Sequence, residues 1–480
     1  MRPLRFPRFR KLDCRNQAYA LLLLCAATAP PIAAQTFTTL FSFDGTDGAD
    51  SSATLVQATN GNLYGATVEG GANGFGAIFK ITPTGTLTTL YSFCSRSDCF
   101  SAYPGGLVQA ANGNFYGTTI EGGAYGTVFE ITPGGTLTTL YSLDFTDGVS
   151  PNAPLVQATN GDLYGTAING GTSSEACPVG CGTVFKMTPS GTLTALHSFC
   201  SQSNCTDGAY PAAALVQATN GDLYGTTLEG GANNQGTVFK ITPSGTLTTL
   251  YSFCSPSGCA DGVSPFAPLV QATDGDLYGT TDYGGANGYG TVFKITPSGT
   301  LTTLYSFDGT VFTYPHALVQ ATDGNFYGTT QEGGTNDSGT VFKITPSGTL
   351  TTLYNFCSQS GCTDGAQPFA GLVQDTNGDL YGTTQIEGAN NDGTVFRLSI
   401  SLRPFVETNP TSGKVGAAVK ILGTSLTGAT SVTLNGTTAT FTVASNTEIK
   451  TTVPAGATTG IVEVTTPTRT LKSNVVFRVP

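Results

Sequence analysis

Several residue types are scarce or missing from this chain of 480 residues. It has no Trp, two Met and two His, and Asp, Glu, Lys and Arg together make up only 11% of it. Gly does not recur at every third position, which excludes a collagen helix. After the first 34 residues no apolar run approaches the about 20 residues that a membrane-spanning helix needs. The apolar residues that are present recur in register, which argues against disorder.

The residues that are abundant indicate β-structure. The chain contains 63 Gly and 25 Pro, with many Thr, Ser, Val, Phe and Tyr. Gly and Pro favour turns, whereas Thr, Val, Phe and Tyr favour strands. The composition therefore predicts an all-β protein with many turns. Because the chain is longer than one ordinary core, we expect two domains.

The N-terminus has the pattern of an export signal. Six basic residues up to Arg15 precede an apolar run at 18–29, and the small residues Ala33 and Ala34 suit a signal peptidase. We expect residues 1–34 to be a signal peptide, with a membrane anchor as the alternative. The remainder carries 14 Lys and Arg against 30 Asp and Glu, a net charge of −16. That charge repels polyanions, so we expect no nucleic-acid partner.

One sequence pattern occurs seven times. It reads LVQATNGDLYGTT, a Gly-rich stretch, GTVFKITPSG and TLTTLYSF, and successive LVQ motifs lie 48–60 residues apart. Four short strand-like runs in about 50 residues are typical of one blade of a β-propeller. We therefore predict a seven-bladed β-propeller of four-stranded blades over residues 35–402. The LVQ motifs begin at Leu55, Leu107, Leu155, Leu215, Leu269, Leu318 and Leu372.

The connections between strands divide into two kinds. An Asn-Gly or Asp-Gly pair separates the first two strands of each unit and predicts a type I′ hairpin turn. Pro-Ser-Gly or a variant joins the third strand to the fourth. These short turns should lie on one face of the ring, the short-turn face. The longer and more variable loops should lie on the other, the long-loop face, where we expect function.

The two ends of the repeat array predict how the ring closes. The seventh unit ends near residue 401 without a fourth strand, whereas residues 36–43 (TFTTLFSF) form such a strand with no unit before it. We expect residues 36–43 to pair with 393–401, complete blade seven and remove a free sheet edge. The alternative is an open solenoid with residues 36–43 as a cap.

The ten cysteines after residue 34 occur in five local pairs. Four pairs follow the fourth strand as FCSxSxC, and units that lack the first cysteine lack the second as well. This is typical of local disulfides in an oxidising compartment. Zinc is the competing interpretation, but a thiolate site usually combines two pairs or adds His. We predict the disulfides Cys94–Cys99, Cys177–Cys181, Cys200–Cys205, Cys254–Cys259 and Cys357–Cys362.

A carboxylate recurs after the second strand in five units. Such a set on one rim would bind cations or sugar hydroxyls, or supply a glycosidase pair. The structural alternative is that each Glu caps its Gly-Gly turn or pairs with a nearby Lys. A binding rim also needs exposed aromatic residues, and three are available. The candidate ligand-binding residues are Glu69, Glu121, Glu229, Glu332, Glu387, Phe75, Tyr125 and Tyr289.

No sequence motif for a nucleophile elbow, a phosphate loop or a zinc-protease helix is present, so we predict no catalytic residue. We also expect no cofactor and no metal. Calcium at the Asp-Gly steps of the inter-blade loops is the alternative to a turn-forming role. His197 replaces a Tyr of the fourth strand and is interpreted as a packing variant. His316 lies in an inter-blade loop.

The repeat stops at Arg403, and the tail has strand-like runs every 8–12 residues, the pattern of a β-sandwich. Residues 404–480 resemble the IPT/TIG family of immunoglobulin-like domains. That resemblance implies a fold and an extracellular setting, with a role as spacer or accessory binder, and no catalytic residues. The residues that carry it include Pro410, Gly413, Gly416, Val419, Ile421, Gly423, Leu426, Phe441, Val453, Pro454, Gly456 and Val464. We therefore expect a second, immunoglobulin-like domain over residues 403–480.

The repeats over residues 36–400 resemble the GloVer tandem repeat of exported bacterial proteins, on the spacing of Leu-Tyr-Gly-Thr-Thr, Gly-Gly and Gly-Thr-Val-Phe-Lys. The resemblance implies an exported protein, secreted or at the cell surface or periplasm of a bacterium, without a settled activity. We expect a non-enzymatic binding or adhesion protein whose partner is an extracellular glycan or a surface protein. A secreted carbohydrate-active hydrolase or lyase and a structural envelope protein are the alternatives.

Overall fold

The computed structural model describes residues 35–480 except 95–102, 174, 176, 256–257 and 310–313. The predicted signal peptide and Cys99 lie outside the described residues. No helix in the described part of the chain has the length and apolarity to cross a membrane.

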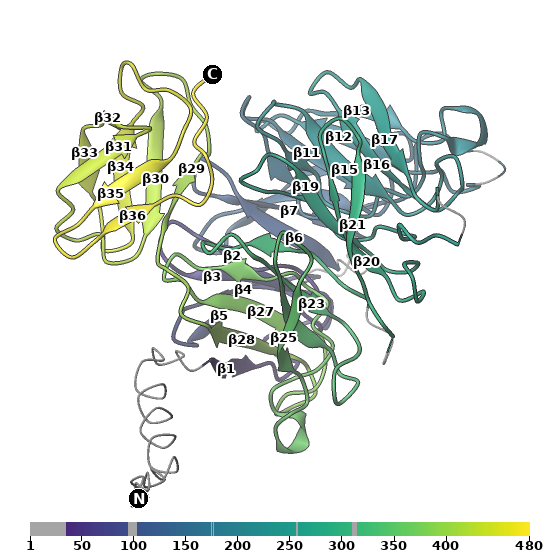
Figure 1. Cartoon of the computed structure of the whole chain (residues 1–480), viewed down its shortest axis with the longest axis horizontal. Coiled ribbons are helices and arrows are strands. Elements are labelled where there is room, and N and C mark those ends of the chain that lie inside the picture. The colour runs from purple at the N-terminus through teal and green to yellow at the C-terminus, as the bar shows by residue number, and fades with distance from the viewer. Residues whose placement is uncertain (1–34, 95–102, 174, 176, 256–257, 310–313) are drawn as a thin grey trace, which may run out of the picture.

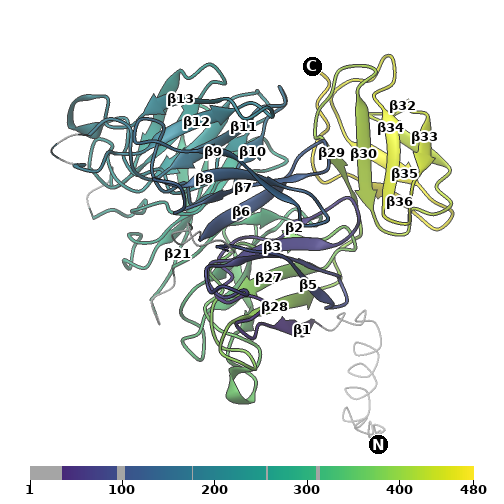
Figure 2. The ribbon, with the colours of Figure 1, turned by 180° about the vertical axis from the view of Figure 1, so that it is seen from behind.

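Seven four-stranded antiparallel sheets surround a common axis and form the predicted propeller (Figure 1, Figure 2). The innermost strands are β2 (Val56–Gln57), β6 (Pro104–Gln109), β10 (Val156–Gln157), β14 (Val216–Gln217), β18 (Val270–Gln271), β22 (Val319–Gln320) and β26 (Val373–Gln374). The second strands, buried throughout, are β3 (Leu63–Thr67), β7 (Phe115–Thr119), β11 (Leu163–Ala167), β15 (Leu223–Thr227), β19 (Leu277–Thr281), β23 (Phe326–Thr330) and β27 (Leu380–Thr384). Each second strand places its Tyr between two blades, which is how a chain without Trp fills that volume.

The outer half of each blade is a second hairpin. The third strands are β4 (Ala77–Ile81), β8 (Thr127–Ile131), β12 (Thr183–Met187), β16 (Thr237–Ile241), β20 (Thr291–Ile295), β24 (Thr340–Ile344) and β28 (Thr394–Ser399). The outermost strands are β5 (Leu87–Ser92), β9 (Leu137–Ser142), β13 (Leu193–Ser198), β17 (Leu247–Ser252), β21 (Leu301–Ser306), β25 (Leu350–Asn355) and β1 (Thr36–Ser42). Short 3-10 turns η1 (Ser203–Cys205) and η2 (Ser360–Cys362) lie in two inter-blade loops.

The predicted closure of the ring is confirmed. Strand β1 pairs with β28 from Thr36 opposite Ser399 to Ser42 opposite Thr394, so the first strand of the chain is the outer strand of blade seven. Phe43 follows β1, is fully buried, and contacts Phe79 of blade one edge-to-face at 5.3 Å. Strand pairing and side-chain packing therefore both cross the closure, which excludes the open solenoid.

A ring of seven glutamine side chains also joins the blades. The Oε1 of the Gln in each innermost strand accepts a hydrogen bond from a backbone N–H of the preceding blade at 2.8–3.1 Å. Gln57 closes this ring by accepting from Thr376 of blade seven. The Gln of the LVQ motif is therefore a structural residue, and it acts between blades.

The hairpin turns differ from the predicted type I′. In the first turn Gly61 donates to Ala58 and Ala58 donates to Asn62, so three residues separate the paired positions. Only Gly61 has a positive φ, +81°, whereas type I′ requires two such residues. The turn is the three-residue type that ends in a left-handed Gly, and the Pro-Thr-Gly turn at Gly85 has the same hydrogen bonds.

The Gly of the Leu-Tyr-Gly motif is required by close packing. A Cβ on Gly225 would lie 2.6 Å from the Phe239 ring and 2.8 Å from Leu215. We expect Gly225→Ala to lower the free energy of unfolding by about 2 kcal/mol, because overpacking displaces these side chains. Thr226→Ala is the control, since the Thr226 hydroxyl is buried without a partner and blade one has Ala66 there. Denaturant titrations that show equal effects of the two substitutions would contradict this prediction.

The C-terminal domain is a sandwich of two four-stranded sheets, as expected for an immunoglobulin-like fold. One sheet has the order β29 (Val406–Asn409), β30 (Ala418–Gly423), β34 (Glu448–Thr452) and β33 (Phe441–Val443). The other has the order β32 (Thr437–Thr438), β31 (Ser431–Leu434), β35 (Val462–Thr465) and β36 (Thr470–Lys472). Alternate residues of both sheets, such as Ile421, Ile449, Val432 and Val464, form one buried core.

This domain contacts the propeller at the short-turn face, beside the ends of β2 and β6 (Figure 1, Figure 2). Its hydrogen bonds reach blades two, four, six and seven, which lie around the ring, so the contact spans the axis. The bonds join Arg478 to Ala218, Asn409 to Gln109, Thr322 to Arg403 and Phe405 to Thr376. The long-loop face is therefore the end of the propeller axis that the domain leaves uncovered.

Candidate functional site

A cavity of about 300 Å³ lies where the inter-blade loops converge on the axis at the long-loop face. Each inter-blade loop turns toward the axis in the same way. A residue with left-handed φ comes first, for example Tyr314 at +37° and Gln367 at +55°, and a Pro follows it in six of the seven loops. In six loops the two or three residues after that position line the cavity, and in the loop into blade two Gly105 does. All seven blades contribute to it, so we call it the axial cavity.

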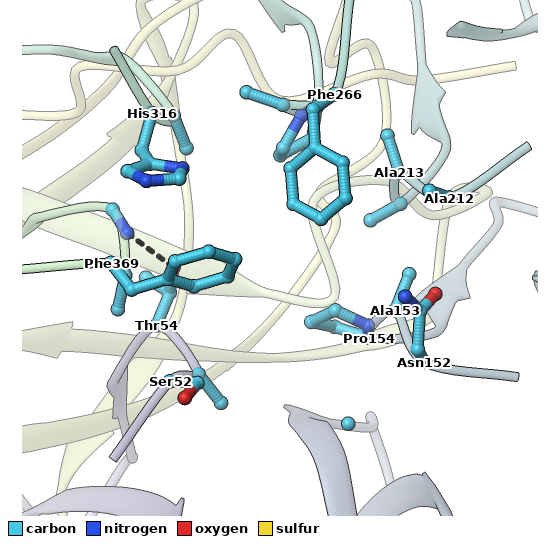
Figure 3. Close-up of a pocket in the computed structure, with 18 of the residues that line it drawn as sticks. Ser52, Thr54, Asn152, Ala153, Pro154, Ala212, Ala213, Phe266, His316 and Phe369 are labelled. Carbon is cyan, nitrogen blue, oxygen red and sulfur yellow. Dashed lines mark hydrogen bonds between the residues drawn. The ribbon is translucent and has the colours of Figure 1, made fainter. Parts of the chain in front are cut away.

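The lining of the axial cavity is not sevenfold symmetric. Phe266, His316 and Phe369 come from the loops that lead into blades five, six and seven, and they gather on one side (Figure 3). The His316 and Phe369 rings lie 4.3 Å apart, and Phe266 meets Phe369 edge-to-face at 5.7 Å. The other loops present small residues across the cavity. Those residues are Ser52, Ala53, Thr54, Gly105, Asn152, Ala153, Pro154, Ala212 and Ala213.

Two buried polar atoms at the axial cavity have no hydrogen-bond partner, the Nε2 of His316 and the Oδ1 of Asn152. Burial lowers the pKa of His316 to about 4, although its hydrogen bond with Gln331 acts in the opposite direction. The imidazole is therefore neutral at neutral pH, and the ring nitrogen that donates to Gln331 leaves Nε2 as an acceptor. Both acceptors are therefore available to a donor group of a ligand or to an ordered water molecule.

A chain of side-chain hydrogen bonds supports His316 from behind. Gln331, which bonds the imidazole, donates its Nε2 to Gln385 at 3.1 Å. Gln385 in turn donates to Asp50 at 3.1 Å and to Ser52 at 3.0 Å. This chain connects blades six, seven and one and fixes the orientation of the imidazole.

The residue directly after the second strand differs in the same part of the ring. Blades one to four have Val68, Ile120, Ile168 and Leu228 there, whereas blades five to seven have Asp282, Gln331 and Gln385. Burial raises the pKa of Asp282 to about 7, and its Oδ1 has no partner. Aromatic and polar substitutions therefore concentrate on blades five to seven.

The predicted rim glutamates lie farther out on the same face. The backbone of Glu69 pairs with Ala49, and that of Glu229 with Ala209, so this position joins the inter-blade loop to its blade. In blade seven Ile386 makes this pair with Ala366, and Glu387 takes the place that Gly70 has in blade one. Glu69, Glu121 and Glu229 are exposed, whereas Glu332 and Glu387 are half-buried. None of the five is among the residues that line the axial cavity, and their role in binding stays a prediction.

Among the residues that the structure describes, no ion pair joins a recurring Lys of the third strand to one of these glutamates. Lys294 lies 2.8 Å from Asp276 and Lys240 3.6 Å from Asp222, both across the hairpin of the second and third strands. In blade four the ion-pair partner of Lys240 is therefore Asp222 and not Glu229, whereas blade five has Tyr283 in place of the rim glutamate. The carboxylate next to the hairpin turn is the nearer partner.

The three predicted rim aromatics are only partly available. Tyr125 is exposed by 39% and meets Phe145 edge-to-face. Phe75 and Tyr289 are half-buried and pack against hydrophobic clusters between blades. Tyr125 is thus the most accessible of the three.

Four of the predicted disulfides are present among the described residues, and Cys94 is also disulfide-bonded although Cys99 lies outside them. In the loops that carry Cys200, Cys254 and Cys357, the Asp of the Asp-Gly step accepts hydrogen bonds from the cysteine loop. Asp364, for example, accepts from the N–H and hydroxyl of Ser358 and from Tyr354. His197 replaces that Tyr and contacts Asp207 at 3.1 Å, so the packing variant keeps the hydrogen bond.

Phe266, Phe369 and Asn152 were not predicted as site residues, and His316 was assigned no site role from the sequence. A signal was present in the sequence. These residues follow or nearly follow the Pro of the inter-blade loop, and the repeats differ there while the flanking LVQ motifs are nearly constant. Only the ring geometry shows that these variable positions meet at the axis.

Comparisons with known proteins agree with both domains. The sequence model of the Gloeobacter/Verrucomicrobia repeat matches residues 100–272 and 264–440, and that of the IPT/TIG domain matches 405–479. No curated protein matches the chain.

Solved structures with a similar fold include streptogramin B lyase, with a TM-score of 0.54 and 16% identity over 77% of this chain and 99% of that one. Virginiamycin B lyase from Staphylococcus aureus has a TM-score of 0.53 and 17% identity over 76% and 99%. The extracellular domain of a one-component system from B. thetaiotaomicron has a TM-score of 0.51 and 12% identity over 81% and 46%. At these identities the likeness concerns the fold.

Proposed function

The chain belongs to the Gloeobacter/Verrucomicrobia repeat family, and from that premise we propose that it is an exported, non-enzymatic binding protein whose axial cavity holds a small polyhydroxylated ligand such as the end of an extracellular glycan. Its disulfides support an oxidising, extracytoplasmic location. The IPT/TIG domain acts as a spacer that presents the long-loop face, because it covers the opposite face.

The observation that carries this proposal is the broken symmetry of the axial cavity. Strands, turns and the glutamine ring repeat around the propeller, so they serve the fold. Phe266, His316 and Phe369 depart from the repeat on one side of a cavity that small residues keep open on the other. Concave, largely apolar sites with a few placed polar groups are typical of small-molecule binding.

The chemistry of the lining favours a ligand with several O–H groups and one apolar face. Nε2 of His316 and Oδ1 of Asn152 are both acceptors without a donor. A sugar supplies hydroxyl donors for both. Its C–H face carries partial positive charge, which the negative face of an aromatic ring such as Phe369 attracts. Outside the cell, sugars of this kind occur in glycans, so an extracellular glycan is the source of the ligand that we propose.

The test is a glycan and polysaccharide array with the protein lacking residues 1–34, followed by calorimetric titration of the best hit. We expect Phe369→Ala to weaken binding by about tenfold or more, because a stacking surface worth about 1.4 kcal/mol is lost. Asn152→Ala should weaken it as well. Tyr125→Ala and Glu229→Gln are the controls on the outer rim. Binding that survives Phe369→Ala but is lost with the rim variants would overturn the axial site.

A secreted hydrolase or lyase is the second candidate, and the unpartnered Nε2 of His316 favours it because this atom can accept a proton from a substrate, but a pKa of about 4 makes the imidazole a weak base at neutral pH. A glycosidase pair needs two carboxyl groups, whereas the lining of the axial cavity offers imidazole, amide and hydroxyl groups. Product release assayed on the array hits separates the two. Release abolished by His316→Asn would establish catalysis, and a chain that neither binds nor releases any glycan would favour a structural envelope role.

A further inference from the structure

Four cysteines from two separate loops of blade three come together in the fold. The Sγ atoms of Cys177, Cys181, Cys200 and Cys205 all lie within 4.8 Å of one another. Three of the four residues are buried and Cys200 is half-buried. They form the disulfides Cys177–Cys181 and Cys200–Cys205. A thiolate zinc site usually combines two cysteine pairs, and the fold brings two pairs together at this place.

We propose that these four cysteines form a redox-dependent zinc site, with two disulfides in the oxidised protein and one tetrahedral Zn²⁺ bound by four thiolates in the reduced protein. With Zn–S bonds of about 2.3 Å, the four sulfurs of such a site lie roughly 3.8 Å apart. The two sulfurs of a disulfide have to separate from about 2 Å to about 3.8 Å. Sulfurs of different disulfides, which lie within 4.8 Å of one another, have to approach by at most about 1 Å. Four thiolates are the ligand set that zinc prefers in structural sites.

The loops that carry the sulfurs are held by bonds that do not involve sulfur. Asp207 accepts from the N–H and hydroxyl of Ser201, and Gly208 donates to the Cys205 carbonyl. On the other loop, Tyr210 donates to the Cys181 carbonyl at 2.8 Å. Because Tyr210 follows the Cys200–Cys205 loop, this bond also ties the two loops together. Reduction therefore leaves the four sulfurs close to one another.

The sequence marks blade three as different at this place. Ten residues separate Gly171 from Gly182, whereas four separate the equivalent Gly231 and Gly236 of blade four. The added residues contain the CPVGC segment, and they place it against the FCSQSNC loop of the same blade. The pairs Cys254–Cys259 and Cys357–Cys362 occur in similar loops without such a segment.

The conversion balances with a dithiol as reductant. Two dithiol molecules each give up two electrons and two protons and become disulfides, while two S–S bonds of the protein break and four S–H groups form. Zn²⁺ then displaces four protons, which leave to solvent as the thiolates bind. Reoxidation by two small disulfide molecules transfers four electrons from the thiolates to them; with four protons from solvent they become dithiols, the two S–S bonds of the protein re-form, and the ion is released.

The test uses the protein lacking residues 1–34, reduced with a phosphine and titrated with Co²⁺ and then Zn²⁺. We expect about one ion per chain, the visible absorption of tetrahedral cobalt thiolate, and no binding by the oxidised protein. Cys177→Ser with Cys181→Ser should abolish the signal. Cys357→Ser with Cys362→Ser is the matched control and should keep it.

Three results would each overturn the proposal. The first would be that the reduced wild-type chain, still folded by circular dichroism, takes up no cobalt. The second would be that the control variant with Cys357→Ser and Cys362→Ser loses the cobalt signal as fully as the variant with Cys177→Ser and Cys181→Ser. The third would be that reduction alone unfolds the propeller, because the loops would then not hold the sulfurs in place.

Discussion

Replacing Phe43 by Ala is expected to lower the free energy of unfolding by about 3–5 kcal/mol, the range for removing a fully buried Phe. Phe43 is 0% exposed although it lies only a few residues after the predicted signal peptide. Its ring packs between blade seven and blade one, edge-to-face on Phe79 at 5.3 Å and 67°. A large loss of unfolding free energy on Phe43→Ala is expected only if the ring of blades is closed, because only then is the Phe43 ring buried between two blades.

Phe253→Ala is the matched control for this prediction. Phe253 has the same place between blades four and five, is 0% exposed, and meets Phe293 at 5.3 Å and 66°. The two substitutions should cost nearly the same in equilibrium denaturation by guanidinium chloride. An open array would leave Phe43 at a frayed end, so a cost below about 1 kcal/mol for Phe43→Ala beside a full cost for Phe253→Ala would contradict closure.

The junction between the two domains should be more stable at pH 5 than at pH 8. Burial raises the pKa of Glu407 to about 7, and the charge of Asp375 adds to that rise. Burial also raises the pKa of Asp375 to about 6, against hydrogen bonds from Asn377 and Gln57. Glu407 lies on β29 of the C-terminal domain and Asp375 in the blade-seven turn that this domain contacts, so the two carboxyl groups face each other across the contact.

The sign follows from the raised pKa values. Both groups hold protons in the folded protein at a pH at which the unfolded chain has released them, so stability falls as the pH rises from about 4 to about 7. We expect the loss to be on the order of 3 kcal/mol, less than two independent shifts would give, because the carboxyl groups interact and Glu407 is half-buried.

Glu407→Gln isolates this contribution. The variant keeps the shape of the side chain and cannot ionise, so its stability should change less between pH 5 and pH 8 than that of the wild type. His316 and Asp282 titrate in or near the same range, but both are unchanged in the variant, and the difference between the two proteins removes them. Equal pH dependence of the two denaturation curves would contradict the assigned coupling.

Much of the architecture could be predicted because the repeat encodes it. Blade number, strand order and the closing role of residues 36–43 follow from counting equivalent runs, and the paired cysteines follow from their joint presence or absence. The turn type could not be predicted as reliably. Asn60-Gly61 fits a type I′ turn in isolation, but the paired residues on either side leave three residues in the loop.

The residues of the axial cavity could not be predicted from the sequence, and the reason is geometrical. Phe266, His316 and Phe369 lie about 50 residues apart, and each appears as a variant within a loop. Their meeting depends on the radius of the ring and on the left-handed residues that turn each loop inward. The glutamates were predicted as ligand-binding residues because they recur in five blades. The residues that line one side of the axial cavity are instead those that differ from blade to blade.

A crystal structure of the protein with the strongest glycan hit would test the axial-site account most directly. The account predicts electron density for the ligand in the axial cavity, stacked on Phe369 and within hydrogen-bond distance of His316 Nε2 and Asn152 Oδ1. Density on the outer rim at the glutamates, with the axial cavity unchanged, would contradict it.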